Sequence, residues 1–214
     1  MIVVNRVVIE SWERFYRANF INCLSGFKPV SLLGTINQQG QTNLGVFSNI
    51  IHIGADPALV GYINRPREAA PHTITNIESS GFYTINHIHF SFLEQAHQAS
   101  AKYPEGISEF DKVGLSPEFR EGFPAPFVRE SVVKYALSLQ EIIPVKINGT
   151  FLVIGKIETV FLAEGLLQQD GFIDLQKAGS VCSNGLDGYY ATNPLGRFRY
   201  AKPGVNPLKI TGHA

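Results

Sequence analysis

The feature that most constrains this fold is a pair of long apolar stretches separated by a short Lys-Ile-Asn-Gly link. They are VVKYALSLQEIIPV (132–145) and TFLVIGKIETVFLA (150–163). Both are rich in β-branched and aromatic residues, which favours strands, and Asn-Gly is the dipeptide best suited to a hairpin turn. The sequence therefore predicts a long antiparallel hairpin, and with it a sheet onto which the rest of the chain packs.

Four shorter stretches have the same β character: KPVSLLGTIN (28–37), TNLGVFSNIIHIG (42–54), ALVGYIN (58–64) and FYTINHIHF (82–90). The first two flank a glycine-containing turn, which predicts a second hairpin. Helical spacing appears in SWERFYRANFINCL (11–24), with Ser11 as its amino cap and Gly26 as its stop, and in FLEQAHQASAKY (92–103). We expect a mostly β fold, an antiparallel barrel with a few flanking helices.

Residues 104–130 carry mainly loop signals, such as PEGISEF and EGFPAPF. An irregular stretch of this length inside a compact domain is usually a lid or a binding loop. We expect one domain over residues 1–214, with an N-terminal helical extension (1–25), a loop or lid insertion (104–130) and a C-terminal extension (176–214).

Charge and cysteine content exclude several classes of protein. The 18 basic and 18 acidic residues cancel, whereas a nucleic-acid-binding protein normally has a basic excess. Two distant cysteines, Cys23 and Cys182, form neither a zinc signature nor a disulfide framework, so we expect reduced thiols. The first residues do not resemble a signal peptide and no segment has the ~20 apolar residues of a membrane helix. We expect a cytoplasmic protein that binds neither nucleic acid nor membrane.

The stretch GYINRPREAAPHTITNIESSGFYTIN (61–86) has the composition of a phosphate site. Arg65 and Arg67 offer guanidinium groups that suit phosphate oxygens, and the hydroxyl of Thr73 or Thr75 adds a donor. Thr75 and Glu78 fit a capping box, which would start a helix whose amino end attracts anions. A surface loop with two solvated arginines and a short capped helix explains the same residues equally well.

Two upstream strands could face a flat ring. SLLGT (31–35) and GVFSN (45–49) each combine apolar residues with small polar ones, which suits a flavin that needs apolar contact on its face and backbone donors along its edge. For any one of these apolar residues, a place in the ordinary core is the more common explanation.

The order of these motifs resembles the flavin reductase-like family, whose members are FMN-binding split barrels and include flavoredoxin. The resemblance covers roughly residues 25–175. It is carried by PVSLLGT (29–35), TNLGVFSNI (42–50), ADPALVGYI (55–63), TITNI (73–77), GFYTIN (81–86), KYPEGISEFDKVGL (102–115), PAPFVRES (124–131) and FLVIGKIETV (151–160).

The resemblance implies a homodimer with FMN, or alternatively FAD, near the subunit interface. It also implies hydride transfer from NAD(P)H to the flavin, so that the cofactor supplies the chemistry and we assign no catalytic side chain and no metal. Tyr103 and the loop through Phe110 would cover the site. The residues implied to bind the cofactor are Ser31, Leu32, Leu33 and Gly34 beside the ring, Phe47, Ser48 and Asn49 at the ring and ribityl chain, and Arg65, Arg67, Thr73 and Asn76 at the phosphate.

The chain departs from the family near its carboxyl end. Many members carry an arginine before a Gly-Gly pair, where this sequence reads SVCSNGLDGYYATNPLGRFRYAKPG (180–204). The nicotinamide contact is therefore open, with Tyr189, Arg197 and Arg199 as replacements.

Other side chains have weaker functional interpretations. His87 and His89 could form a metal pair, but two partly exposed histidines on an edge strand are more common. Glu109 could organise the lid, although a carboxylate at the start of a helix is the simpler explanation. Cys182 is more simply an idle thiol than a nucleophile.

Three functions remain open. The first is an NAD(P)H-dependent flavin reductase or flavoprotein oxidoreductase acting on a small redox substrate. The second is a flavoredoxin-type FMN electron carrier that serves a protein acceptor without a nicotinamide site of its own. The third is a non-catalytic protein that uses the same barrel to bind haem or another ligand.

Overall fold

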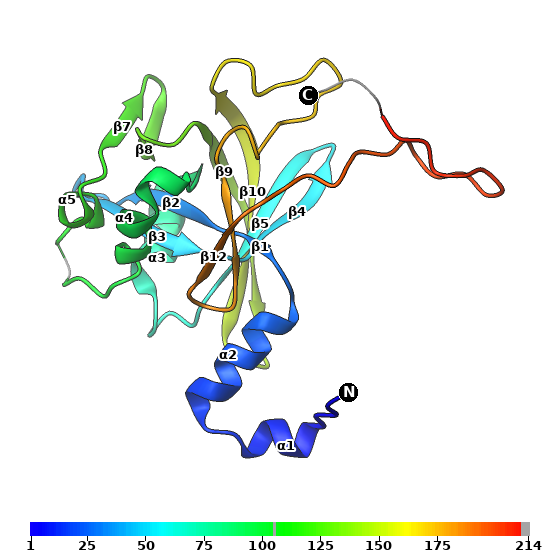
Figure 1. Cartoon of the computed structure of the whole chain (residues 1–214). Helices are drawn as coiled ribbons and strands as arrows, with labels where there is room; N and C mark the ends of the chain where they lie inside the picture. Colours follow the sequence, from blue (N-terminus) through cyan, green and yellow to red (C-terminus); the bar gives the residue numbers. More distant parts are fainter. Residues whose placement is uncertain (105, 211–214) are drawn as a thin grey trace.

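The computed structural model describes residues 1–104 and 106–210 (Figure 1). Its helices are α1 (Arg6–Ser11), α2 (Arg14–Leu24), α3 (Pro71–Ser80), α4 (Leu93–Gln98) and α5 (Glu109–Val113), with a 3-10 turn η1 at Phe90–Phe92. Its strands are β1 (Lys28–Pro29), β2 (Ser31–Ile36), β3 (Thr42–Phe47), β4 (Ile50–Ala55), β5 (Ala58–Asn64), β6 (Phe82–His87), β7 (Pro117–Arg120), β8 (Phe123–Val128), β9 (Val133–Val145), β10 (Thr150–Leu162), β11 (Val181–Asn184) and β12 (Gly188–Ala191).

Seven strands form one antiparallel sheet in the order β3-β2-β6-β9-β10-β5-β4. Its edge strands, β3 and β4, are consecutive in the chain and only Ser48 and Asn49 separate them. A sheet whose two edges are joined by two residues has to curl back on itself. The mostly β, split-barrel fold class expected from the sequence is therefore confirmed.

The β9–β10 hairpin forms as the sequence predicted, and its two strands are the longest of this sheet. It pairs Thr150 with Val145 and continues to Leu162 opposite Val133. Val145 accepts the amides of Asn148 and Gly149, and Gly149 adopts a positive φ of 72° that its lack of a side chain permits. The predicted hairpin of β2 and β3 also forms.

Two core clusters lie on opposite faces of β2, because successive side chains of a strand point to opposite sides. Leu32 joins Leu44, Phe110 and Val128 in one cluster. Leu33 joins Tyr62, Ile74, Tyr83 and Leu137 in the other, which α3 covers.

Residues 104–130 are more ordered than the sequence predicted. Helix α5 and the β7–β8 hairpin replace the expected loop, and Phe110 and Phe127 are fully buried. The loop prediction was wrong because the glycines and prolines of this segment, which are loop signals by themselves, end α5 at Gly114 and lie within the β7–β8 hairpin. Strand β8 pairs with β7 alone, and a proline without an amide is tolerated in such a strand.

The helical predictions need smaller corrections. The segment 11–24 forms α2 from Arg14, and the carboxylate of Glu13 accepts the amides of Phe15 and Tyr16, so Glu13 is the cap and Ser11 is not. The helix predicted over 92–103 is shorter, since α4 ends at Gln98. Among the described residues no helix is long and apolar enough to cross a membrane.

Candidate functional site

The loop between β5 and α3 is held from both ends. The carbonyl of Pro66 accepts the amide of Ala70 at 3.2 Å, which closes a tight turn. The side-chain amide of the fully buried Asn64 donates to the carbonyl of Arg65 at 2.7 Å and to that of Ala70 at 3.4 Å. This loop, residues 65–70, therefore carries its arginines on a constrained backbone.

Helix α3 begins without a side-chain cap. Its N-cap residue is Ala70, which has no side-chain acceptor, and Pro71 occupies the first turn. The predicted capping box is therefore wrong, because Thr75 lies in mid-helix and Glu78 lies near its end. Proline favours the first helical position, since its fixed φ suits the helix and it has no amide to satisfy. The uncapped amino end of α3 is a place where an anion can accept the free amides.

A buried polar cluster connects this end of α3 to β2 and β3. The amide of Asn43 donates to the hydroxyls of Thr35 at 3.3 Å and Thr73 at 3.2 Å, and the amide of Asn76 donates to Thr35 at 3.1 Å. Because the Thr73 oxygen accepts, its own proton remains free to donate to a ligand. Asn76 thus links α3 to β2 through its hydrogen bond to Thr35.

Gly45 on β3 allows Thr73 to approach the sheet. A Cβ placed on Gly45 would lie 2.9 Å from the Phe47 ring and 3.3 Å from the Thr73 hydroxyl oxygen. Any larger residue would push the helix or the aromatic ring away. Steric crowding by Phe47 and Thr73 therefore explains why a glycine occupies position 45 of the TNLGVF motif.

The two arginines of the loop differ in their surroundings. Arg67 forms a two-pronged pair with Glu78, with nitrogen–oxygen distances of 2.8 and 2.5 Å, and its guanidinium lies 5.0 Å from the centre of the Phe151 ring. The hydrogen bond from Arg67 lowers the pKa of the Glu78 carboxyl. Arg65 is exposed, and no carboxylate of the described chain pairs with it. Arg65, in the loop that leads into α3, is thus a cation without a carboxylate partner in the described chain.

The four β2 residues expected beside the ring are all buried. Leu32 and Leu33 belong to the two core clusters. A Cβ on Gly34 would lie 2.1 Å from the carbonyl oxygen of Pro126, so β8 already covers this glycine. Ser31 is buried as well. None of these four residues therefore presents an exposed side chain to a ring.

Phe47, Ser48 and Asn49 lie together where β3 turns into β4, and each is half-buried. The Phe47 ring packs edge-on against Tyr62 at 4.8 Å between centroids. The Asn49 side chain bonds both backbone groups of Ile63, at 2.9 and 3.2 Å, and so ties the turn to β5. The turn between β3 and β4 is thus bonded to β5, and β5 leads directly into the loop 65–70 and the start of α3.

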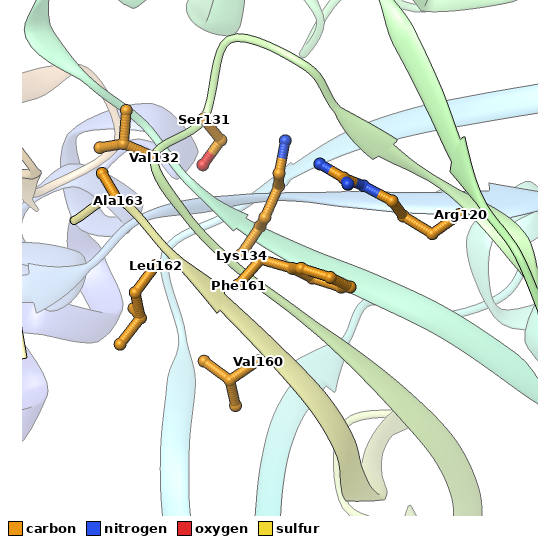
Figure 2. Close-up of a pocket in the computed structure, with 8 residues that line it drawn as sticks. All are labelled: Arg120, Ser131, Val132, Lys134, Val160, Phe161, Leu162 and Ala163. Carbon is orange, nitrogen blue, oxygen red and sulfur yellow. The ribbon is translucent and has the colours of Figure 1, made fainter.

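A hollow lies elsewhere, between β7 and the β9–β10 hairpin (Figure 2). It has a volume of about 440 Å³ and adjoins a second hollow of about 330 Å³. None of the residues implied to bind the cofactor lines either hollow. The lining residues of the first are Arg120, Ser131, Val132, Lys134, Val160, Phe161, Leu162 and Ala163.

Comparison with known proteins gives this geometry its context. The flavin reductase like domain matches residues 27–176. The chain belongs to the flavin reductase-like family.

Three solved structures illustrate the likeness. A split-barrel protein from Shewanella frigidimarina NCIMB 400, provisionally named a flavin reductase, is 47% identical, with a TM-score of 0.91 over 94% of this chain and 100% of that one. Flavoredoxin of Desulfovibrio vulgaris (Miyazaki F) is 25% identical, with a TM-score of 0.69 over 84% and 92%. Nitrilotriacetate monooxygenase component B from Bacillus cereus, 18% identical with a TM-score of 0.80 over 91% and 96%, shares the fold.

The other candidates of this flavin reductase-like chain are occupied by local contacts. His87 lies on β6, a central rather than an edge strand, and its ring nitrogen lies 3.3 Å from the Ser180 hydroxyl. His89 bonds Ser91 instead, at 2.7 Å. Within residues 1–104 and 106–210 no cluster of three or more metal-ligating side chains exists. Cys23 and Cys182 are both free thiols.

Glu109 covers the exposed edge of β3. Its carboxylate accepts the Leu44 amide at 2.8 Å, and the neighbouring Ser108 hydroxyl lies 2.7 Å from that of Thr42. Burial raises the pKa of Glu109. Helix α5 is thus fastened to the strand that carries Gly45 and Phe47.

Sequence reasoning missed Thr35, Asn43, Asn64 and Gly45 as parts of this site. Each stands inside a quoted motif, and three are polar residues in apolar strands. A polar residue in an apolar strand indicates a buried hydrogen-bond partner, and this pattern could have identified Thr35, Asn43 and Asn64.

Proposed function

We propose that this protein binds FMN and works as an NAD(P)H-dependent flavin reductase. The observation that carries the proposal is the uncapped amino end of α3, with the free Thr73 proton and Arg65 beside it, in a barrel of the flavin reductase-like family. A phosphate monoester suits two free helix amides, a hydroxyl and a guanidinium. FAD would present its pyrophosphate to the same groups.

Arg65, Arg67 and Thr73 would hold the phosphate, and Asn76 would position α3. Arg67 can reach a ligand only by exchanging its contact with Glu78, so its part is conditional on that exchange. Phe47, Ser48 and Asn49 would meet the ring and the ribityl chain. The Ser31–Gly34 strand would contribute through its backbone, since its side chains are buried.

When bound, the flavin would accept hydride from the nicotinamide and pass the electrons to a small redox substrate or a protein acceptor. The chain's own residues bind the cofactor, orient it and exclude water. No side chain acts as an acid or a base in this scheme. A homodimer with the flavin near the interface, and a cytoplasmic location that suits two free thiols, complete the proposal.

The test is a visible absorption spectrum of the purified protein with added FMN, before and after NADH or NADPH without oxygen. A flavin spectrum that bleaches within seconds is the expected result, and the faster donor identifies the nicotinamide. A protein that leaves the spectrum and fluorescence of FMN unchanged would overturn the proposal.

A second candidate is an FMN electron carrier. It is favoured by the likeness to flavoredoxin and by the sequence SVCSNGLDGYY (180–190), which lacks the arginine and Gly-Gly pair of many family members. A bound flavin that NADH and NADPH leave oxidised, but that dithionite reduces, would favour this candidate.

A further inference from the structure

The chain contains two Asn-Gly pairs, and both lie at the turns of β-hairpins. Asn148-Gly149 joins β9 to β10, and Asn184-Gly185 leads from the end of β11 towards β12. Because glycine has no side chain, it leaves the backbone nitrogen after the asparagine open to reaction with the asparagine side chain. The two pairs are chemically identical, so a difference in their reactivity has to come from their surroundings.

The reaction that this pair of residues undergoes is deamidation. The backbone nitrogen of the glycine attacks the side-chain carbonyl carbon of the asparagine and forms a cyclic imide. The bond from that carbon to the side-chain nitrogen breaks, and this nitrogen leaves as ammonia after taking the backbone amide proton. Water then opens the imide at either carbonyl, which gives aspartate or isoaspartate. An amide and a water molecule thus become a carboxylate and an ammonium ion, and the reaction needs no oxidant, reductant or cofactor.

The tip of the β9–β10 hairpin is open to water. Asn148 and Gly149 are both exposed, and the neighbouring Ile147 is 93% exposed. The Gly149 amide bonds the Val145 carbonyl at 3.0 Å, and a hydrogen bond at an exposed hairpin tip opens at a small cost in free energy. The Gly149 nitrogen can therefore be freed for attack, and water can reach the imide.

The Asn148 side chain folds over the backbone that would attack it. Its Oδ1 accepts the Thr150 amide at 3.1 Å and the Thr150 hydroxyl at 2.8 Å. This local turn brings the side-chain carbonyl over the intervening Gly149 peptide. Attack by the Gly149 nitrogen puts negative charge on Oδ1, and donors aimed at that oxygen stabilise the charge, as the donors of an oxyanion hole do. Thr150 therefore both orients and activates the side-chain carbonyl of Asn148.

The second pair lies in packed surroundings. Asn184 belongs to β11 and pairs with Gly188 of β12, and its Oδ1 is buried with no hydrogen-bond partner among the described residues. A Cβ placed on Gly185 would lie 3.0 Å from the Cys23 sulfur and 3.2 Å from the Asn19 side-chain oxygen. Helix α2 therefore covers the Gly185 backbone, and tight packing resists the side-chain movement that attack requires.

We propose that Asn148 is a site of spontaneous deamidation in the folded protein and that the fold protects Asn184. The product carries a carboxylate at a hairpin tip that packs against the loop 65–70, since a Cβ on Gly149 would lie 3.7 Å from the Pro66 ring. The modification therefore adds negative charge beside the arginine-bearing loop of the proposed phosphate site. The reaction itself does not depend on flavin binding.

The test is peptide mass mapping of the full chain during incubation in warm, mildly alkaline buffer. Trypsin cleaves after lysine and arginine and so releases the two pairs in separate peptides, residues 147–156 and 178–197. The only other asparagine in these peptides, Asn193, precedes Pro194, whose nitrogen has no proton to give up. The mass of each peptide therefore reports on one Asn-Gly pair. The same incubation in urea removes the fold and leaves the local sequences unchanged.

Two variants test the part of Thr150. Thr150→Val removes the hydroxyl donor and keeps the backbone amide and the branched shape of the side chain. Thr150→Ser keeps the hydroxyl and is the matched control. Asn148→Asp already carries the carboxylate, so its peptide should gain no mass. Circular dichroism checks that each variant is folded.

We expect peptide 147–156 of the folded protein to react roughly tenfold or more faster than peptide 178–197, and Thr150→Val to slow it roughly threefold or more. Thr150→Ser should react like the unsubstituted chain, and the two peptides should react at similar rates in urea. An Asn148 that stays unmodified, equal rates for the two pairs in the folded protein, a difference that persists in urea, or an unchanged rate in Thr150→Val would each overturn the proposal.

Discussion

At the scale of single residues, the proposed phosphate site rests on a few contacts around α3. Thr73 and Thr75 are two residues apart on one helix, but Thr73 is buried against Asn43 and Thr75 is exposed. Thr73 therefore lies on the buried face of α3, where it can take part in the site, and Thr75 on the exposed face is a chemically identical control.

Thr73→Ala should weaken FMN binding by about 1–3 kcal/mol, the range for losing a hydrogen bond to a charged group. Thr75→Ala is the control and should leave the affinity unchanged. Titration of FMN fluorescence measures both. Equal affinities for the two variants would remove Thr73 from the phosphate site.

Arg67→Ala should weaken FMN by a similar ~1–3 kcal/mol if the guanidinium exchanges Glu78 for the phosphate. Glu78→Gln separates the two roles of this arginine, because it breaks the ion pair and keeps the guanidinium. A loss of affinity in Glu78→Gln as large as in Arg67→Ala would mean that the ion pair, and not a phosphate contact, matters.

At the scale of elements, α5 stabilises an edge of the barrel. The carboxylate of Glu109 binds the Leu44 amide that β3, as an edge strand, would otherwise leave without a partner inside the protein. The helix thereby closes the side of β3 that faces away from β2.

Glu109→Ala should lower the free energy of unfolding by about 1–3 kcal/mol, because it leaves a buried amide without an acceptor. Glu109→Gln keeps an acceptor oxygen and should lose less. Urea unfolding measures both. A Glu109→Ala variant as stable as the unsubstituted protein would contradict this role.

The same residue gives a pH signature of known sign. Burial raises the pKa of Glu109 in the folded state, so the folded protein binds this proton more tightly than the unfolded chain. Its contribution to stability is present at low pH and is lost as pH rises through the folded pKa. The stability of the unsubstituted protein relative to Glu109→Gln should therefore fall between acidic and neutral pH.

At the scale of the whole molecule, the half-buried His87 on β6 makes the folding equilibrium depend on pH in the acidic range. Its pKa is lowered by burial from 6.5 to about 4, so the unfolded chain binds this proton more tightly. The neutral imidazole lies between β6 and the segment that holds Ser180. Acid therefore pulls the equilibrium towards the unfolded chain.

Protonation of His87 in the unfolded chain should reduce the free energy of unfolding progressively as pH falls from about 6.5 to 4, by up to about 3 kcal/mol. His87→Gln should flatten that part of the curve. Urea midpoints at pH 7 and pH 5 for both proteins measure the difference. Parallel curves for the two proteins would show that His87 does not titrate on unfolding.

Much of the fold could be predicted from short-range patterns. The β9–β10 hairpin followed from two apolar stretches around Asn148-Gly149, and the β2–β3 hairpin from a glycine turn, because both are local in sequence. The order of motifs indicated the family and its split barrel. Arg65, Thr73 and Asn76 were also selected from the sequence as candidates, and their role in binding FMN stays a prediction.

The tertiary structure decided the points that depend on distant residues. Helix α3 begins at Pro71 rather than at the predicted Thr75, and its residues Ile74 and Ile77 pack in the core cluster with Leu33 of β2 and Leu137 of β9. The prolines of β8 were compatible with a strand because only β7 pairs with it, which no local pattern reveals. The link from Asn43 to Thr73 joins a strand and a helix 30 residues apart.

The sequence by itself thus determined the β2–β3 and β9–β10 hairpins and the chemical character of the loop before α3, since these depend on neighbouring residues. Only the tertiary structure decided which polar residues meet, and that Arg67 is paired with Glu78 while Arg65 has no carboxylate partner in the described chain. Those facts depend on how a curled sheet brings distant segments together, and long-range packing is not encoded in any short stretch of the chain.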